Sequence, residues 1–175
     1  MRILGIDPGS RFTGYGIIEV QGDSTVCVVH GVIKTGGKTG DGEFPERLGI
    51  IFSGIRNLIA EHRPDQAAVE SVFVSRNPNS ALKLGQARGA AICAVVEQGL
   101  TESEYSPRSV KQAIVGRGSA DKEQVKHMIS MLLHVKEALA EDAADALAVA
   151  LCHHHTQQTV QRMRVLRGGD PINDV

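Results

Sequence analysis

Residues 2–20 read RILGIDPGSRFTGYGIIEV, and this stretch decides the fold. It opens with an apolar run that ends at Asp7 and is followed by the turn-forming residues 8–10. A second run, rich in isoleucine and valine, covers roughly Gly14 to Val20. Two such runs with a short connection predict an antiparallel pair of strands, because parallel pairing needs a crossover of a dozen or more residues.

Beyond this pair, the chain adds a third strand and then alternates helices with short strands. Apolar residues at helical spacing, proline at helix starts and glycine after helix ends mark the helices. The predicted elements are a strand over 25–34, a glycine-rich loop over 36–42, a helix over 45–62, a strand over 66–70, a helix capped by Asn79 or Ser80 and ended by Gly99, a strand over 104–106, a helix from Pro107 to Gly116, a helix beginning near Asp121, and a long helix over 139–160. Strands separated by helices pair in parallel, so we expect an α/β fold with a mixed five-stranded sheet flanked by helices.

The composition indicates one soluble domain. The chain has 175 residues, of which 42% are apolar and 22% charged. A chain of this length buries roughly two-thirds of its surface without metals or cross-links. We expect one domain over residues 1–160 and a flexible tail over 161–175, where apolar periodicity is lost. No run approaches the roughly 20 apolar residues of a membrane span and none suits a signal peptide, which predicts a cytoplasmic protein without membrane contact.

Several classes of function are disfavoured by the same data. Aromatic residues make up 3% of the chain and tryptophan is absent, which argues against binding bases mainly by stacking on a sheet. Cys27, Cys93 and Cys152 are far apart and form no C-x-x-C pair, so we interpret them as small buried hydrophobic residues. The formal net charge of −1 neither indicates nor excludes a nucleic-acid partner, because the distribution of surface charge matters more than its sum.

Two acids stand at the ends of apolar strands. Asp7 comes directly before Pro8 and Gly9, and Glu70 closes the short run that begins at Gln66. In open α/β sheets, ligands bind in the crevice outside the strand ends, so these acids could face one site. An acid at a turn is also ordinary, and for either residue alone that interpretation is at least as good.

The last helix carries two more acids, Asp142 and Asp145, at a spacing that places them on one face. Stabilisation of the helix start by negative charge is the simpler interpretation. It does not explain the neighbouring small and apolar residues, which should pack against the sheet: Ala143, Leu147, Ala150 and Leu151. Four converging carboxylates would repel one another unless a cation such as Mg²⁺ or Mn²⁺ neutralised them. Two such ions about 4 Å apart can activate water and stabilise the leaving oxygen of a phosphodiester.

Five motifs carry a resemblance to a known family. They are ILGIDPGS (3–10), VESVF (69–73), NSALKLGQARG (79–89), SPRSVKQAIVGRGSADK (106–122) and DAADALA (142–148). In this order, over about residues 1–158, they resemble the RuvC family of Holliday junction resolvases. The resemblance implies a ribonuclease H-like fold, a homodimer, and paired hydrolysis of two symmetry-related strands at a four-way DNA junction in recombination and repair. It also implies two Mg²⁺ ions per subunit, with Mn²⁺ as a substitute.

The resemblance also assigns residues. Asp7, Glu70, Asp142 and Asp145 match the family's catalytic acids and would hold the metal. Lys111 and Lys122 match family lysines near the cleaved strand, and Phe73 matches an aromatic residue that stacks against a base. Further basic candidates for contacts to the DNA backbone are Arg76, Lys83, Arg88, Arg108 and Arg117. Glu141 is turned about 100° from Asp142 on the helix and is left out of the set.

Partners and alternatives complete the prediction. The resemblance implies that the RuvA and RuvB branch-migration complex acts with this chain. An actin-like or sugar-kinase ATPase also begins with a strand, an aspartate and a glycine turn, but it needs a second domain, and the chain has no G-x-x-x-x-G-K-[ST] loop. A noncatalytic junction-binding module is the other alternative, which the intact set of four acids disfavours.

Three adjacent histidines, His153, His154 and His155, invite a zinc site. Successive residues point to different faces of a helix, so the three cannot readily form one site. We expect contacts with the C-terminal end of the helix dipole or plain exposure to solvent.

Overall fold

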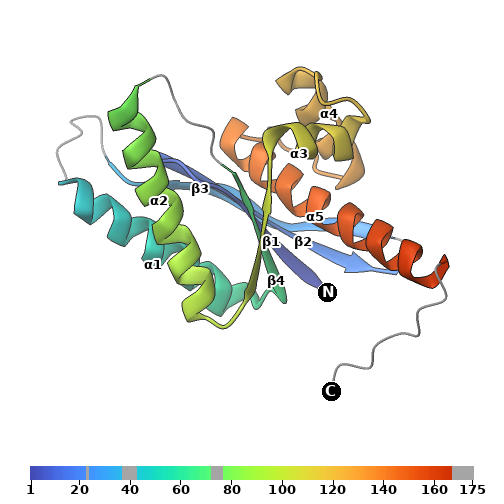
Figure 1. Ribbon diagram of the computed structural model, residues 1–175, viewed down its shortest axis with the longest axis horizontal. Coiled ribbons are helices and arrows are strands. Elements are labelled where there is room, and N and C mark those ends of the chain that lie inside the picture. Colours follow the sequence, from blue (N-terminus) through green and yellow to red (C-terminus); the bar gives the residue numbers. More distant parts are fainter. Residues whose placement is uncertain (23, 37–42, 72–76, 167–175) are drawn as a thin grey trace.

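The computed structural model describes residues 1–22, 24–36, 43–71 and 77–166, and the structural statements below concern these residues. The elements are β1 (Arg2–Asp7), β2 (Phe12–Gln21), β3 (Ser24–Lys34), α1 (Phe44–His62), β4 (Gln66–Glu70), α2 (Pro78–Glu97), β5 (Thr101–Tyr105), α3 (Pro107–Val115), α4 (Lys122–Leu132) and α5 (Glu141–Leu166). Helices lie on both faces of one sheet (Figure 1). No helix in these described ranges is both long and apolar enough to cross a membrane.

The sheet has the strand order β3-β2-β1-β4-β5. The hairpin partners β1, β2 and β3 pair antiparallel, whereas β1 with β4 and β4 with β5 pair parallel. The parallel partners are joined through helices, which provide the crossover that parallel pairing needs. The expected mixed five-stranded sheet flanked by helices is therefore confirmed.

Side-chain alternation along the strands divides the core into two layers. In β1, Leu4 and Ile6 point toward α1 and α2, whereas Ile3 belongs to the layer that faces α5. In β4, Ala67 and Val69 face α1 and α2, and Ala68 faces α5. Because side chains alternate with a period of two, Asp7 and Glu70 fall on the α5 side of the sheet.

Helix α5 lies very close to the sheet because glycines occupy the strand positions beneath it. A Cβ atom at Gly5 would overlap the backbone of Ala146, and one at Gly16 would collide with the side chain of Leu147. A Cβ at Gly14 would overlap the carbonyl oxygen of Asp142. The glycines of β1 and β2 thus determine the distance between the helix and the sheet. The small residues of the helix alone did not predict this role.

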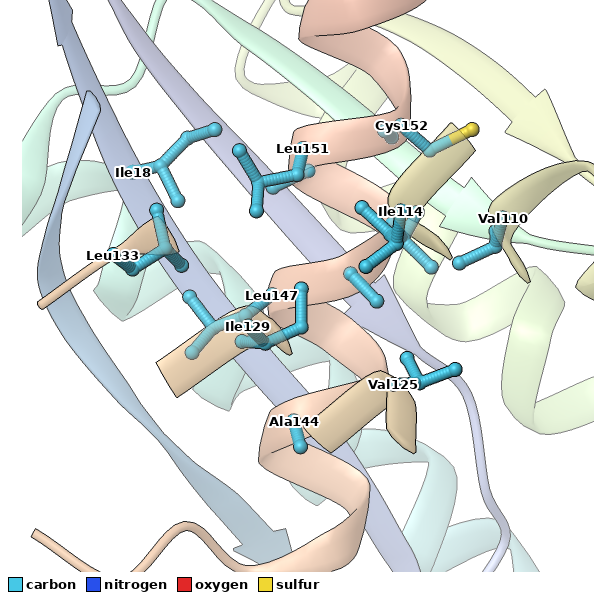
Figure 2. Close-up of a cluster of buried hydrophobic side chains, with 14 of the residues drawn as sticks. Ile18, Val110, Ile114, Val125, Ile129, Leu133, Ala144, Leu147, Leu151 and Cys152 are labelled. Atoms are coloured by element: carbon cyan, nitrogen blue, oxygen red, sulfur yellow. The ribbon is translucent and has the colours of Figure 1, made fainter. Parts of the chain in front are cut away.

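The sequence predicted a single apolar stripe along α5, but the middle of this helix is buried on two sides. Its residues from Ala146 to His154 are all buried. Figure 2 shows Leu151 directed toward Ile18 of the sheet and Ile129 of α4 beside Leu147, with Val110 and Ile114 of α3 on the other side of the helix. The helix also continues to Leu166, beyond the expected end at Val160, because no proline or glycine interrupts it there.

Three local predictions were wrong. Strand β5 covers Thr101–Tyr105 and not 104–106; its sequence, TESEY, is largely polar, so apolar alternation could not reveal it. The side chain of Asn77, which precedes Pro78, caps α2, and not Asn79 or Ser80. Of the three cysteines, Cys152 is buried and Cys27 partly buried, but Cys93 is exposed.

Candidate active site

Asp7 and Glu70 end two neighbouring parallel strands. The register pairs Ile6 with Val69, so the next residue of each strand is one of these acids. The two carboxyl groups interact, and this contact favours a proton on Asp7 because it raises the pKa of Asp7 and lowers that of Glu70. The parallel pairing, together with the alternation of side chains, brings both carboxylates to one point on the α5 face.

The first turns of α5 bring the other two acids to the same place. Asp7 is paired in register with Gly14, and Gly14 lies directly beneath the backbone of Asp142. Asp145 follows three residues later and interacts electrostatically with both Asp7 and Glu70. The structure therefore brings together all four predicted acids, from β1, β4 and α5.

Burial and mutual repulsion make these carboxylates hard to ionise. Burial is the largest cause for Asp7, and the charges of Glu70, Asp145 and Asp142 add to it, raising the pKa of Asp7 to about 8. Burial also raises the pKa of Glu70, Asp142 and Asp145, with a further contribution from neighbouring acids in each case. A site that resists ionisation without a counterion favours a bound cation.

Two lysines lie beside the acids. Lys122, the first residue of α4, donates a hydrogen bond to Glu141 and has its Nζ 3.7 Å from Asp145 Oδ2. Hydrogen bonding to Glu141 is the main cause that raises the pKa of Lys122. Lys111 of α3 acts from further away and, with Lys122, favours the ionised form of Glu70. Glu141, which the sequence analysis set aside, is therefore a neighbour of the site through Lys122.

The remaining predicted DNA contacts within the described residues come from helices on both faces of the sheet. Lys83 lies over the ring of Phe44, with Nζ 5.6 Å from the ring centroid. Arg88 donates a hydrogen bond of 2.6 Å to Glu104 on β5, which gives it a structural role. Arg108 lies in α3, and Arg117 lies between α3 and α4. Phe73 and Arg76 lie outside the described residues.

The donor set suits a hard divalent cation. Carboxylate oxygens are the ligands that Mg²⁺ and Mn²⁺ prefer. Burial, followed by repulsion from neighbouring acids, raises the pKa of Asp7, so a bound cation would stabilise its ionised form. No three His, Cys, Asp or Glu side chains among the described residues already stand as a complete ligand group. Asp7, whose pKa is raised to about 8, would have to lose its proton for both carboxylates to bind one cation.

The histidines of α5 do not contribute to this site, and the expectation that they are exposed or merely contact the helix dipole was wrong for two of them. His153 and His154 are buried, at 2% and 6% exposed. His153 Nδ1 lies 2.9 Å from the hydroxyl oxygen of Tyr105. His155 contacts the carbonyl oxygen of Ala113 in α3. The prediction that they point to different faces is confirmed.

This fold and this site together define a class of protein. A mixed sheet with acids at the ends of two adjacent parallel strands, and two more acids at the start of a helix lying across them, is the arrangement of ribonuclease H-like, metal-dependent nucleases. In that class, paired cations held by carboxylates activate water for phosphodiester hydrolysis.

Comparison with known proteins specifies the family. Residues 3–153 match the family model described as crossover junction endodeoxyribonuclease RuvC. Crossover junction endodeoxyribonucleases RuvC of Methylococcus capsulatus and Alkalilimnicola ehrlichii are 57% and 54% identical to this chain; each alignment covers 93% of this chain and 95% and 96% of the relative. The structure of Thermus thermophilus RuvC in complex with Holliday junction substrate is 35% identical with a TM-score of 0.84, covering 91% of this chain and 96% of that one.

The chain belongs to the RuvC family of crossover junction endodeoxyribonucleases. The expected ribonuclease H-like fold and nuclease class are thereby confirmed. Membership also removes the alternative of an actin-like or sugar-kinase ATPase.

Proposed function

We propose that this chain forms a homodimer that resolves Holliday junctions, with each subunit cutting one of two symmetry-related strands. The observation that carries this proposal is the convergence of Asp7, Glu70, Asp142 and Asp145 from three elements, with Lys122 beside them. Similarity to a relative that was solved with a Holliday junction supports the choice of substrate.

The residues divide into two roles. Asp7, Glu70, Asp142 and Asp145 would hold two Mg²⁺ ions, for which Mn²⁺ can substitute, and when bound these ions supply a nucleophilic water and stabilise the leaving oxygen. Lys122 would place its ammonium group against a nonbridging oxygen of the scissile phosphate. Lys111 would hold an adjacent phosphate from α3. No covalent intermediate on the protein is required.

Contacts away from the centre would hold the junction. Lys83, Arg108 and Arg117 would neutralise backbone phosphates, which gives affinity that depends on salt and little on sequence. Arg88 would do so only after leaving Glu104. Phe73 and Arg76 remain predicted contacts on the strength of the sequence resemblance.

The homodimer has a candidate surface on α2. Leu82 and Val96 are 66% and 60% exposed, and Cys93 is exposed between them. Gly85 and Gly89 lie on the same face, and Cβ atoms there would meet nothing within 4 Å. An apolar helix face with small residues at its centre allows a symmetric copy to approach closely, and two-fold symmetry suits a substrate with two equivalent cuts.

Cross-linking tests this surface. Two copies of Cys93 near a two-fold axis should form a disulfide under mild oxidation, and Gly89→Glu should give a monomer in sedimentation. If Cys93 forms no intersubunit disulfide and Gly89→Glu remains a dimer, the interface lies elsewhere. A matched control is Cys27→Ser, which leaves the α2 face unchanged.

The expected setting follows from this assignment. The protein would act in the cytoplasm, on the nucleoid when bound to DNA, together with the RuvA and RuvB branch-migration complex.

Cleavage of a synthetic mobile four-way junction in Mg²⁺, compared with linear duplex, tests the proposal. Wild type should cut the junction symmetrically, whereas Asp7→Asn should bind it without cutting. Binding by wild type without metal-dependent cuts would favour a noncatalytic junction-binding module instead.

A further inference from the structure

His153 lies at the centre of a buried polar network that the proposed chemistry does not use. Its imidazole has Nδ1 at 2.9 Å from the Tyr105 hydroxyl oxygen and Nε2 at 2.9 Å from Gln66 Oε1. The Tyr105 ring meets it edge-on, with the ring centroids 5.6 Å apart. Gln157, one turn along α5, places its amide nitrogen 3.0 Å from Nε2. One side chain thus connects a helix to two strands.

The two strand contacts define what the side chain at this position must do. A neutral imidazole satisfies both strand contacts when Nε2–H donates to Gln66 and Nδ1 accepts the proton of the Tyr105 hydroxyl. In this tautomer the amide of Gln157 must turn its oxygen, not its nitrogen, toward Nε2. His153 itself is 2% exposed, whereas Gln66 and Tyr105 are partly exposed. An apolar side chain at position 153 would therefore remove the polar link between α5 and the two strands.

This network ends beside the carboxylates. Gln66 opens β4 and Glu70 closes it, so His153 holds the strand that carries Glu70. At the other end, the backbone amide of Ser71 donates to the carbonyl oxygen of Tyr105 at 2.8 Å. Tyr105 therefore fixes the chain directly after Glu70 through its backbone and is itself held by His153 through its hydroxyl group.

His153 is also part of α5, whose first turns carry Asp142 and Asp145. It lies 11 residues beyond Asp142, about 16 Å along the helix axis, which is too far for it to bind the same cation. Its effect on the site must pass through Gln66 and Tyr105. Outer groups that orient metal ligands often change metal affinity by 10–100-fold when they are removed.

We propose that His153 is a positioning residue that, through Gln66 and Tyr105, sets Glu70 against Asp142 and Asp145 at the spacing needed to bind metal. This inference rests on the proposed function only in taking these carboxylates as metal ligands.

The test compares His153→Leu with wild type by calorimetric titration of Mn²⁺ in the absence of DNA. We expect the Mn²⁺ dissociation constant to rise about tenfold. Junction cleavage at saturating metal should show kcat lowered about tenfold, with the junction dissociation constant in EDTA within about twofold of wild type. Tyr105→Phe, which removes a single hydroxyl group, should shift the Mn²⁺ affinity in the same direction by a smaller factor.

The matched control is Val95→Ala, a change in α2 on the opposite face of the sheet that lowers stability without touching the network. Its Mn²⁺ affinity and kcat should stay at the wild-type values. If His153→Leu also lowers only the melting temperature, His153 is a structural residue and the proposal is wrong. If His153→Leu does not fold, unchanged Mn²⁺ affinity in Tyr105→Phe would overturn it. If His153→Leu weakens Mn²⁺ binding but the wild-type protein cuts no junction, the positioning role of His153 stands and the proposed function is wrong.

Discussion

The first turns and the middle of α5 pack against the same sheet, but the first turns carry acids that repel one another, whereas the middle is buried and mostly apolar. The first turns hold Asp142 and Asp145 against Asp7 and Glu70, where burial and like charges raise the pKa of every acid. The middle, from Ala146 to His154, is buried between the sheet and helices α3 and α4, and His153 within it is hydrogen-bonded to Gln66. The packed middle supplies the stability that holds the repelling carboxylates together. Function and stability can therefore be altered separately along one helix.

The largest effect should come from removing an acid of the first turns. Asp145→Asn should lower junction cleavage by at least about 10³-fold, because it removes a metal ligand and with it transition-state stabilisation. Its melting temperature without metal should stay equal or rise, since the substitution removes a repelling charge. Cleavage assays and thermal unfolding in EDTA measure the two quantities. A variant that is both inactive and markedly destabilised would contradict the separation between the halves of the helix.

The converse effect should come from the buried middle. Leu147 is fully buried against Gly16, so Leu147→Ala should lower the free energy of unfolding by about 2–5 kcal/mol. The folded fraction should keep kcat within about twofold of wild type. Urea unfolding and cleavage at low temperature provide the measurements, and Met131→Ala, at an exposed position of α4, is the control.

A third variant acts at the junction of the two regions. Gly14→Ala should push the start of α5 away from β2, because the added Cβ would overlap the carbonyl oxygen of Asp142. We expect cleavage to fall about 10–100-fold, more than stability alone explains. The control is Gly22→Ala. Gly22 lies in the β2–β3 turn with open space around it, although its positive φ adds some strain. If Gly14→Ala cleaves as well as Gly22→Ala, close approach of α5 is not what places Asp142.

The smallest expected effect is on the pH dependence of stability. Asp7 binds a proton more tightly in the folded protein, where its pKa is about 8, than in the unfolded chain, where it is 3.8. Without metal, its contribution is therefore fully present below pH 4 and is lost as the pH rises to about 8. Asp7→Asn should flatten this dependence in thermal scans across that range. A wild-type protein that gains stability from pH 5 to 8 in EDTA would contradict the raised pKa.

The sequence predicted these two regions unequally. Apolar runs located β1 to β4, and acids at strand ends and at helical spacing located Asp7, Glu70, Asp142 and Asp145, because those patterns are local. The polar strand β5 was misplaced, since its residues alternate without an apolar face. The close contact between α5 and the glycines of β1 and β2 was not predicted. A glycine normally weakens a strand, and its packing role becomes evident only when the position of the helix is known.

Long-range pairing accounts for the other omissions. Glu141 was excluded by its direction on the helix, yet it reaches the site through Lys122 of α4. His153 was hidden in a run of three histidines, and its partners, Gln66 and Tyr105, are 87 and 48 residues away in the chain. Nothing local in the sequence distinguishes this buried histidine from an exposed one.

The central claim is that four carboxylates from three elements form one metal site. Calorimetric titration of Mn²⁺ into the DNA-free protein at pH 7, repeated in buffers of different ionisation enthalpy, tests it most directly. Wild type should release close to one proton on binding, because at pH 7 metal displaces the proton held by Asp7, whose pKa is about 8, and Asp7→Asn should abolish both the release and the tight binding. Equal Mn²⁺ affinity in wild type and Asp7→Asn, with no proton released by either, would contradict the account.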